Sequence, residues 1–153
     1  MDLSFLRDPV GHAERGENPT VLLKMRCGFA VIGVMQFLPG YCLLLASPRA
    51  DRLESLTRDT RAAFLDDMGL LGEAVAQVCA PHRVNYSIYG NTDPYLHAHV
   101  VPRYAWEAPE RLSRPIWTYP TELWTNPAHI YDEEKHGGLA KRIATALKQI
   151  ASL

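Results

Sequence analysis

Residues 95–101 place two histidines two positions apart inside an apolar run. Successive side chains of a β-strand point to opposite faces, so every second residue shares a face, about 6.5–7 Å from the next. One face of this segment is aliphatic and carries Leu96, Ala98 and Val100. The other face carries His97, His99 and Val101, with Tyr95 just before them on the same side. The pattern predicts a strand that packs against a helix with one face and presents two neighbouring imidazoles on the other.

The rest of the chain predicts a small sheet with two helices. Further short apolar runs, typical of strands, lie at 21–25, 29–35, 41–46 and 85–89. A long amphipathic helix follows the third run, with Phe64, Met68, Leu71, Val75 and Val78 at steps of four and three. Thr57 is its expected N-cap, Pro81 ends it, and a second helix is expected at 138–150. Because short loops join most of the strands, the fold class is α+β, with an antiparallel sheet of about five strands, one long helix and a C-terminal helix.

The 153 residues are expected to form one domain at 21–153, preceded by a mobile or draped N-terminal arm at 1–20. A C-terminal extension begins at about residue 105. The segment 104–127 contains four prolines and all three tryptophans, Trp106, Trp117 and Trp124. These rings either pack over the domain or form one wall of a binding site, and we expect Trp117 and Tyr119 to be packing residues.

Composition excludes several function classes. The formal net charge of −1 argues against nucleic acid as a partner, because nucleic-acid binding needs a concentrated basic face. Three cysteines without a CxxC pair indicate neither a disulfide framework nor a thiolate zinc site, which favours a reducing compartment. The sequence contains no run of 18 or more apolar residues that could form a membrane span. We therefore expect a cytoplasmic protein without a membrane partner.

The histidine pair admits three interpretations. The two imidazoles can be ordinary surface or core-edge side chains. They can hold a metal, as in a zinc- or manganese-dependent hydrolase, but residues 100–104, which follow the pair, offer no good third ligand. They can also act on a phosphate, with one imidazole as nucleophile and the other as hydrogen-bond donor. We predict no metal bound by side chains. A metal-dependent hydrolase stays the third alternative, and it would show stoichiometric zinc or manganese in the purified protein.

The segment Leu-His-Ala-His-Val-Val-Pro-Arg at 96–103, preceded by Gly90-Asn91, resembles the signature of the histidine triad (HIT) superfamily. That signature is His-φ-His-φ-His-φ-φ, with φ apolar, often followed by Pro-Arg. The run Phe-Ala-Val-Ile at 29–32 and the corner at Pro39-Gly40 are similar to the family's strand-turn-strand, so the resemblance covers roughly residues 21–104. Within the superfamily, the sequence resembles the bacterial branch of HIT-like or diadenosine tetraphosphate hydrolases. The resemblance implies a HIT-like fold.

The resemblance also implies roles for individual residues. His97 matches the nucleophile that attacks the α-phosphorus of a nucleotide and forms a nucleotidyl-histidine, which water hydrolyses; a backbone carbonyl orients its second ring nitrogen. His99 would donate a hydrogen bond to an α-phosphate or bridging oxygen, and Asn91 would bind the phosphate or the leaving-group oxygen. The implied substrate-binding residues are Val31 and Leu43, which match positions that clasp the base, together with Tyr41 and Tyr95. From strand alternation, and not from the resemblance, the Arg103 side chain is expected on the face of Val100, away from His99.

Tyr95 departs from the family pattern, because it occupies the position of the first histidine of the triad. If that position orients His97 through its backbone carbonyl, the chain is a nucleotide hydrolase or nucleotidyl transferase acting on dinucleoside polyphosphates or nucleotide phosphoramidates. If the histidine side chain is required, the chain is a non-catalytic nucleotide-binding module. Either hypothesis implies a small nucleotide ligand and a homodimer. No cofactor is expected, although Mg²⁺ can accompany a polyphosphate.

Overall fold

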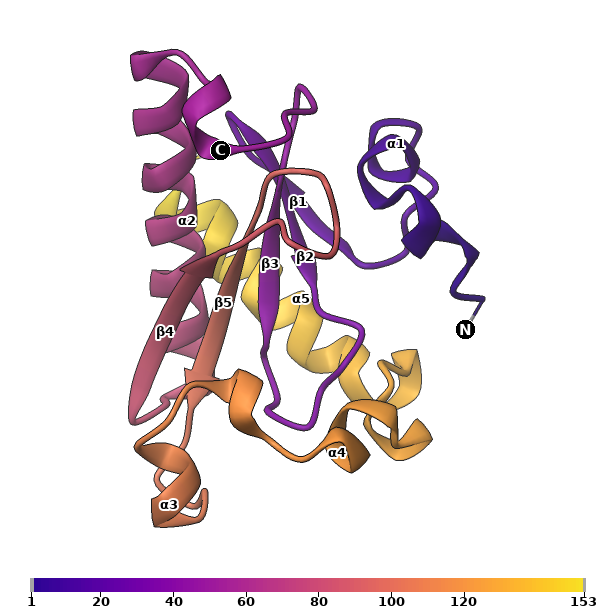
Figure 1. The fold of residues 1–153 in the computed structure, drawn as a ribbon, viewed down its shortest axis with the longest axis vertical. Coiled ribbons are helices and arrows are strands. Elements are labelled where there is room, and N and C mark those ends of the chain that lie inside the picture. Colours follow the sequence, from indigo (N-terminus) through magenta and orange to yellow (C-terminus); the bar gives the residue numbers. More distant parts are fainter. Residues whose placement is uncertain (1, 153) are drawn as a thin grey trace.

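The computed structural model describes residues 2–152 and contains one five-stranded antiparallel sheet (Figure 1). The strands lie in the order β1-β2-β3-β5-β4. Their bounds are β1 Val21–Lys24, β2 Gly28–Ile32, β3 Cys42–Ala46, β4 Arg83–Ile88 and β5 His97–Arg103. Strand β5, which carries both histidines, therefore lies between β3 and β4. The predicted α+β class and five-stranded sheet are confirmed.

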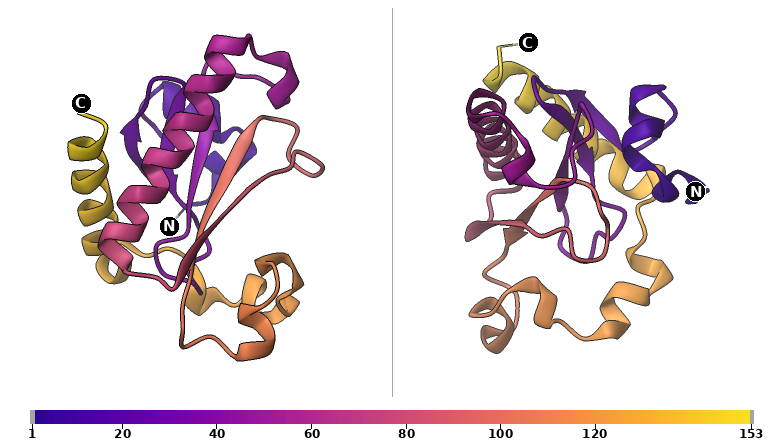
Figure 2. Two further views of the ribbon diagram at one scale, coloured as in Figure 1. Left: turned by 90° about the vertical axis from the view of Figure 1, so that its left-hand side faces the viewer. Right: turned by 45° about the horizontal axis from the view of Figure 1, so that its top comes forward.

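Two helices cover one face of the sheet, α2 (Arg58–Cys79) and α5 (Glu133–Ile150). They pack against each other on the same side of the strands (Figure 2). The main hydrophobic core lies between these helices and the sheet, and Leu96, Ala98 and Val100 belong to it together with Phe64 and Leu71. The aliphatic face of β5 thus packs on the long helix, as the alternation predicted.

The ends of both helices follow from capping residues. The Thr57 side chain accepts a hydrogen bond from the Thr60 backbone N–H at 3.2 Å, which confirms the predicted N-cap of α2. Helix α5 begins five residues earlier than predicted, at Glu133. The Asp132 side chain accepts from the Lys135 N–H at 3.0 Å, and this cap stabilises a first turn that the glycines at 137 and 138 made unexpected.

The N-terminal residues cover part of the opposite face. Helix η1 (Ser4–Arg7) and helix α1 (Pro9–Glu14), which the sequence did not predict, lie on the side of the sheet away from α2 and α5 (Figure 1). Val10 and Ala13 are buried against Phe29, Val31 and Leu45. The segment 1–20 is therefore draped over the sheet along its described residues.

The C-terminal extension crosses one end of the sheet and contains four short helical turns (Figure 1). These are α3 Pro109–Leu112, η3 Ile116–Thr118, α4 Thr121–Thr125 and η4 Pro127–His129. Ile116 packs on Leu38, Tyr41 and Val101 in a separate hydrophobic cluster. This contact brings the tryptophans of the extension to the histidine-bearing face of the sheet.

Candidate active site

His97 and His99 lie next to each other on the sheet face that the long helices leave uncovered. Their ring centroids are 4.8 Å apart. Strand pairing places Leu45 opposite His97 on one side of β5, and Leu43 opposite His99. On the other side of β5, Ser87 of β4 is opposite His99. Because directly opposed residues of antiparallel strands share a face, aliphatic side chains border the imidazoles toward β3 and polar ones border them toward β4.

The backbone of Tyr95 fixes the tautomer of His97. His97 Nδ1 lies 2.8 Å from the Tyr95 carbonyl oxygen. A carbonyl can only accept a hydrogen bond, so Nδ1 carries the proton and the unshared electron pair is on Nε2. Tyr95 thus supplies an orienting contact to His97 without using its side chain. Burial raises the pKa of the Tyr95 phenol to about 12, which keeps that ring neutral beside His97.

Tyr41 holds the second imidazole. Its hydroxyl lies 2.7 Å from His99 Nδ1, and both side chains are buried. Burial, followed by the proximity of His97, lowers the pKa of His99 to about 4, so His99 is neutral at pH 7. Burial raises the pKa of the Tyr41 phenol, so the hydroxyl keeps its proton at pH 7, and we assign it as the donor to Nδ1. That assignment leaves an N–H on Nε2 of His99.

The depressed pKa of His99 predicts a loss of stability in acid. The imidazole binds a proton more readily in the unfolded chain, where its pKa is near 6.5, so stability falls as the pH drops from about 6.5 toward 4. We expect His99 to contribute about 2–3 kcal/mol of this loss in the free energy of unfolding. Urea titrations at pH 7 and pH 4 should therefore show a smaller loss for His99→Gln than for the wild type.

The matched control for this measurement is His82→Gln, which changes an exposed histidine and should leave the acid loss unchanged. An acid loss of equal size in the wild type and in His99→Gln would contradict the assignment of His99 as a buried neutral imidazole.

Two cavities meet at the histidine pair. The first, about 210 Å³, is mainly apolar and includes Val31, Leu43, Tyr41 and Tyr95 in its lining, together with His97 and His99. The second, about 530 Å³, is lined by Tyr89 and the loop 90–93, including Asn91, and by Trp117 and the same two histidines. All seven residues that the sequence singled out therefore line one or both cavities. Asp93, which was not singled out, also belongs to both linings.

The tryptophans of the extension form a wall beside His99. The Trp117 ring meets the His99 ring edge-on, with centroids 4.7 Å apart, and it stacks on Trp124 at 5.6 Å. Trp117 is 39% exposed and lines the larger cavity, whereas Trp124 lines the smaller one. The expectation that Trp117 is only a packing residue is wrong, because the extension folds back over the sheet. No local sequence pattern signals that return.

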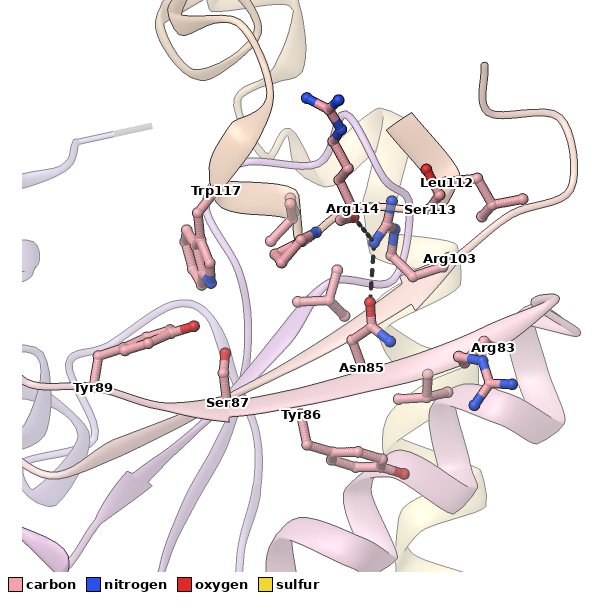
Figure 3. A pocket seen from close by; sticks show the side chains of 14 residues that line it. Arg83, Asn85, Tyr86, Ser87, Tyr89, Arg103, Leu112, Ser113, Arg114 and Trp117 are labelled. Atoms are coloured by element: carbon pink, nitrogen blue, oxygen red, sulfur yellow. Dashed lines mark hydrogen bonds between the residues drawn. The ribbon is translucent and has the colours of Figure 1, made fainter. Parts of the chain in front are cut away.

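Arg103 lies on the same face of β5 as the histidines, which corrects the sequence prediction. The pairing of β4 with β5 runs without a bulge from Arg83 opposite Arg103 to Ile88 opposite Ala98, so residues 97, 99, 101 and 103 share a face. The Arg103 guanidinium is buried in an ion pair with Glu107 at 3.0 Å. It also donates to Asn85 Oδ1 at 3.0 Å and to the Arg114 carbonyl oxygen at 2.7 Å (Figure 3). Arg103 ties the extension to the sheet.

Two searches of the described residues bear on metals and membranes. Within residues 2–152, no group of three or more His, Cys, Asp or Glu side chains is arranged to hold a metal ion. None of the helices in that range is both long enough and apolar enough to cross a membrane.

Comparison with known proteins identifies the architecture. No protein-family model and no curated protein matches the sequence. A histidine triad protein from Sinorhizobium meliloti is similar in structure, with a TM-score of 0.71 and 18% identity over 95% of each chain. A hypothetical histidine triad nucleotide-binding protein from Sulfolobus tokodaii matches with a TM-score of 0.69 and 14% identity, over 92% of this chain and 91% of that one. The diadenosine triphosphate hydrolase of Plasmodium falciparum matches with a TM-score of 0.60 and 14% identity, over 85% and 77%. The chain has the fold of the histidine triad proteins.

Proposed function

We propose that the chain is a nucleotide hydrolase or nucleotidyl transferase that acts at an α-phosphorus through a covalent intermediate on His97. The observation that carries the proposal is the 2.8 Å contact between His97 Nδ1 and the Tyr95 carbonyl oxygen. It supports a nucleophilic role because it leaves the electron pair of Nε2 available at the meeting point of the two cavities. Among proteins of this fold, one is a diadenosine triphosphate hydrolase and another is described as nucleotide-binding, which supports the substrate class.

In the first step His97 Nε2 attacks the α-phosphorus, a phosphorus–nitrogen bond forms, and the bond to the leaving group breaks. The leaving group departs with the bonding electron pair, while the Nε2–H of His99 hydrogen-bonds to the oxygen on which negative charge develops. The positive charge on the His97 ring is stabilised by the Tyr95 carbonyl through Nδ1–H. In the second step water attacks the same phosphorus and the phosphorus–nitrogen bond breaks, with its electron pair returning to His97 Nε2. A nucleoside monophosphate and a proton are released, and His97 is neutral again.

The remaining residues of the linings bind the substrate. Val31 and Leu43 supply apolar contacts for a nucleobase in the smaller cavity. Asn91 is the proposed hydrogen-bonding partner of the phosphate or leaving-group oxygen in the larger cavity. Asp93, which lines both cavities, is the proposed acceptor of a hydrogen bond from a sugar hydroxyl.

Two substrates with different leaving groups test the proposal. The wild type should hydrolyse diadenosine tetraphosphate or an adenosine 5′-phosphoramidate. The release of AMP is measured by chromatography. Tight binding of both nucleotides without release of AMP would instead favour the non-catalytic module. The Tyr95 carbonyl favours the hydrolase, because the orienting contact survives the replacement of the first triad histidine.

Tyr41 is proposed as a positioning residue, because its hydroxyl reaches His99. In Tyr41→Phe the buried Nδ1 of His99 loses its hydrogen-bond donor. The tautomer of His99 that carries its proton on Nε2 is then no longer stabilised. We expect kcat to fall about tenfold, corresponding to roughly 1.4 kcal/mol, with little change in KM. The pH profile of kcat should also change at its acidic limb.

Tyr86→Phe is the matched control, because Tyr86 lies on strand β4 and is 45% exposed. It should leave kcat and the pH profile unchanged. A Tyr41→Phe enzyme with the wild-type pH profile would show that the hydroxyl does not act through His99.

The homodimer remains a prediction of the resemblance, and the cytoplasmic location remains a prediction of the composition. Mg²⁺, if required, is proposed to arrive with a polyphosphate substrate rather than to be held by side chains.

A further inference from the structure

A third cavity lies beyond the histidine pair, on the side away from the apolar cavity. Its volume is about 530 Å³, and it runs along β4 under the segment 112–117 of the extension (Figure 3). Its floor includes Arg83, Asn85 and Ser87, which are opposite Arg103, Val101 and His99 of β5 and therefore share the histidine face. We call this cavity the β4 groove.

The β4 groove continues the histidine site. Tyr89 and Trp117 line both the groove and the larger cavity, and their rings meet edge-on with centroids 5.5 Å apart. Both rings are partly exposed, 54% and 39%, and they mark the boundary between the two spaces. Tyr89 lies six positions after Arg83, which corresponds to roughly 20 Å along an extended chain.

The groove is polar and carries no acidic lining residue. Three arginines and no Asp or Glu are among its lining residues. Glu107 neutralises Arg103, and the Arg114 side chain extends away from β4 (Figure 3). The free positive charge at the groove therefore comes from Arg83, which takes part in none of the ion pairs within residues 2–152. The Ser87 hydroxyl and the Asn85 amide point into the groove from β4 (Figure 3). This chemistry suits phosphate oxygens rather than an aliphatic chain or a cation.

The wall of the groove is anchored to the sheet. Arg103 donates to the carbonyl oxygens of Arg111 at 2.8 Å and Arg114 at 2.7 Å, so a buried side chain of β5 holds the segment that forms the wall. A cavity anchored in this way is formed before the ligand arrives, which lowers the entropic cost of binding.

We propose that the β4 groove receives the leaving group of the substrate, and that this group is an oligophosphate such as a nucleoside polyphosphate. The inference rests on the proposed function. The order of the strands supports it: the apolar cavity lies over β2 and β3, the nucleophile lies on β5, and the groove lies over β4. A substrate with its base in the apolar cavity and its α-phosphorus at His97 extends its remaining phosphates past His99 toward Ser87 and Asn85.

An isosteric charge change tests the groove. Asn85→Asp keeps the oxygen that accepts from Arg103 and adds a negative charge to the floor. We expect kcat/KM for diadenosine tetraphosphate, whose leaving group is ATP, to fall about tenfold. The value for an adenosine 5′-phosphoramidate with a small amine leaving group should stay within twofold. Arg83→Ala removes an exposed positive charge. It should lower kcat/KM for diadenosine tetraphosphate about fivefold and leave kcat/KM for the phosphoramidate unchanged.

Gln149→Glu is the control, because it makes the same amide-to-carboxylate change at an exposed position of α5. It should leave kcat/KM unchanged for both substrates. Equal losses for both substrates in Asn85→Asp, or no loss for diadenosine tetraphosphate in either groove variant, would overturn the inference.

Failure of the proposed function would look different, since the wild type would then turn over neither substrate. In that case the affinities for ATP and AMP, measured by calorimetry, test the groove directly. Weaker binding of ATP to Asn85→Asp, by fivefold or more, with unchanged binding of AMP supports the groove as an oligophosphate site. Unchanged binding of ATP, or an equal loss for ATP and AMP, overturns it.

Discussion

His97→Ala is expected to lower the turnover of a dinucleoside polyphosphate or nucleotide phosphoramidate by at least about 1000-fold, because it removes the only nucleophile of a two-step reaction. Affinity for a nucleoside monophosphate should change only a few-fold, since the apolar cavity is also lined by Val31, Leu43 and Tyr41. Release of product under saturating substrate measures the first quantity, and calorimetry with AMP measures the second.

The control is His12→Ala, which removes a histidine of the N-terminal helix α1 whose Nδ1 contacts the Asp8 carbonyl oxygen. It should retain full turnover. Equal rates of product release from the wild type and His97→Ala would remove His97 as the nucleophile. A large loss of AMP affinity in His97→Ala, together with lost turnover, would assign the histidine to binding rather than to chemistry.

The largest expected effect on stability comes from Glu107. This carboxylate is buried, pairs with Arg103 at 3.0 Å and accepts from the Tyr104 backbone N–H at 2.6 Å. Glu107→Ala leaves the buried guanidinium without its counter-charge, and losing one member of such a pair typically costs about 3–5 kcal/mol. We expect a decrease of that size in the free energy of unfolding, measured by urea denaturation.

Glu110→Ala serves as the matched control, because Glu110 is an exposed residue in the first turn of α3. It should change stability by no more than about 0.5 kcal/mol. A Glu107→Ala protein within 1 kcal/mol of the wild type would mean that the extension does not depend on this ion pair. Because Arg103 also holds the wall of the β4 groove, Glu107→Ala should also weaken the protection of residues 111–117 from hydrogen exchange.

Local periodicity accounts for what the sequence could predict. The alternation at 96–101 and the four-and-three spacing along 64–78 are consequences of strand and helix geometry, so they located β5, α2 and the shared face of the histidines. The Thr57 cap was visible for the same reason, since capping depends on neighbouring residues alone. The seven residues chosen from the pattern and the family resemblance all line the two cavities.

Non-local packing accounts for what the sequence could not predict. Trp117 reaches His99 only because residues 104–131 cross the end of the sheet, and no periodic pattern encodes that path. Helix α1 is six residues long and depends on burial of Val10 and Ala13 against the sheet, so its own sequence gave a weak signal. The Tyr41–His99 contact joins residues 58 positions apart, which only the strand order brings together.

The most direct test of the proposed chemistry is to trap the intermediate. The wild type, mixed rapidly with diadenosine tetraphosphate and quenched in alkali, should carry one adenylyl group, detected by intact-protein mass spectrometry and mapped by peptide sequencing to His97. The adduct should be labile in acid, as expected of a phosphorus–nitrogen bond, and should be missing from His97→Ala. Hydrolysis of the substrate by the wild type with no adduct on His97, or with an adduct on another residue, would contradict the proposal that His97 is the nucleophile.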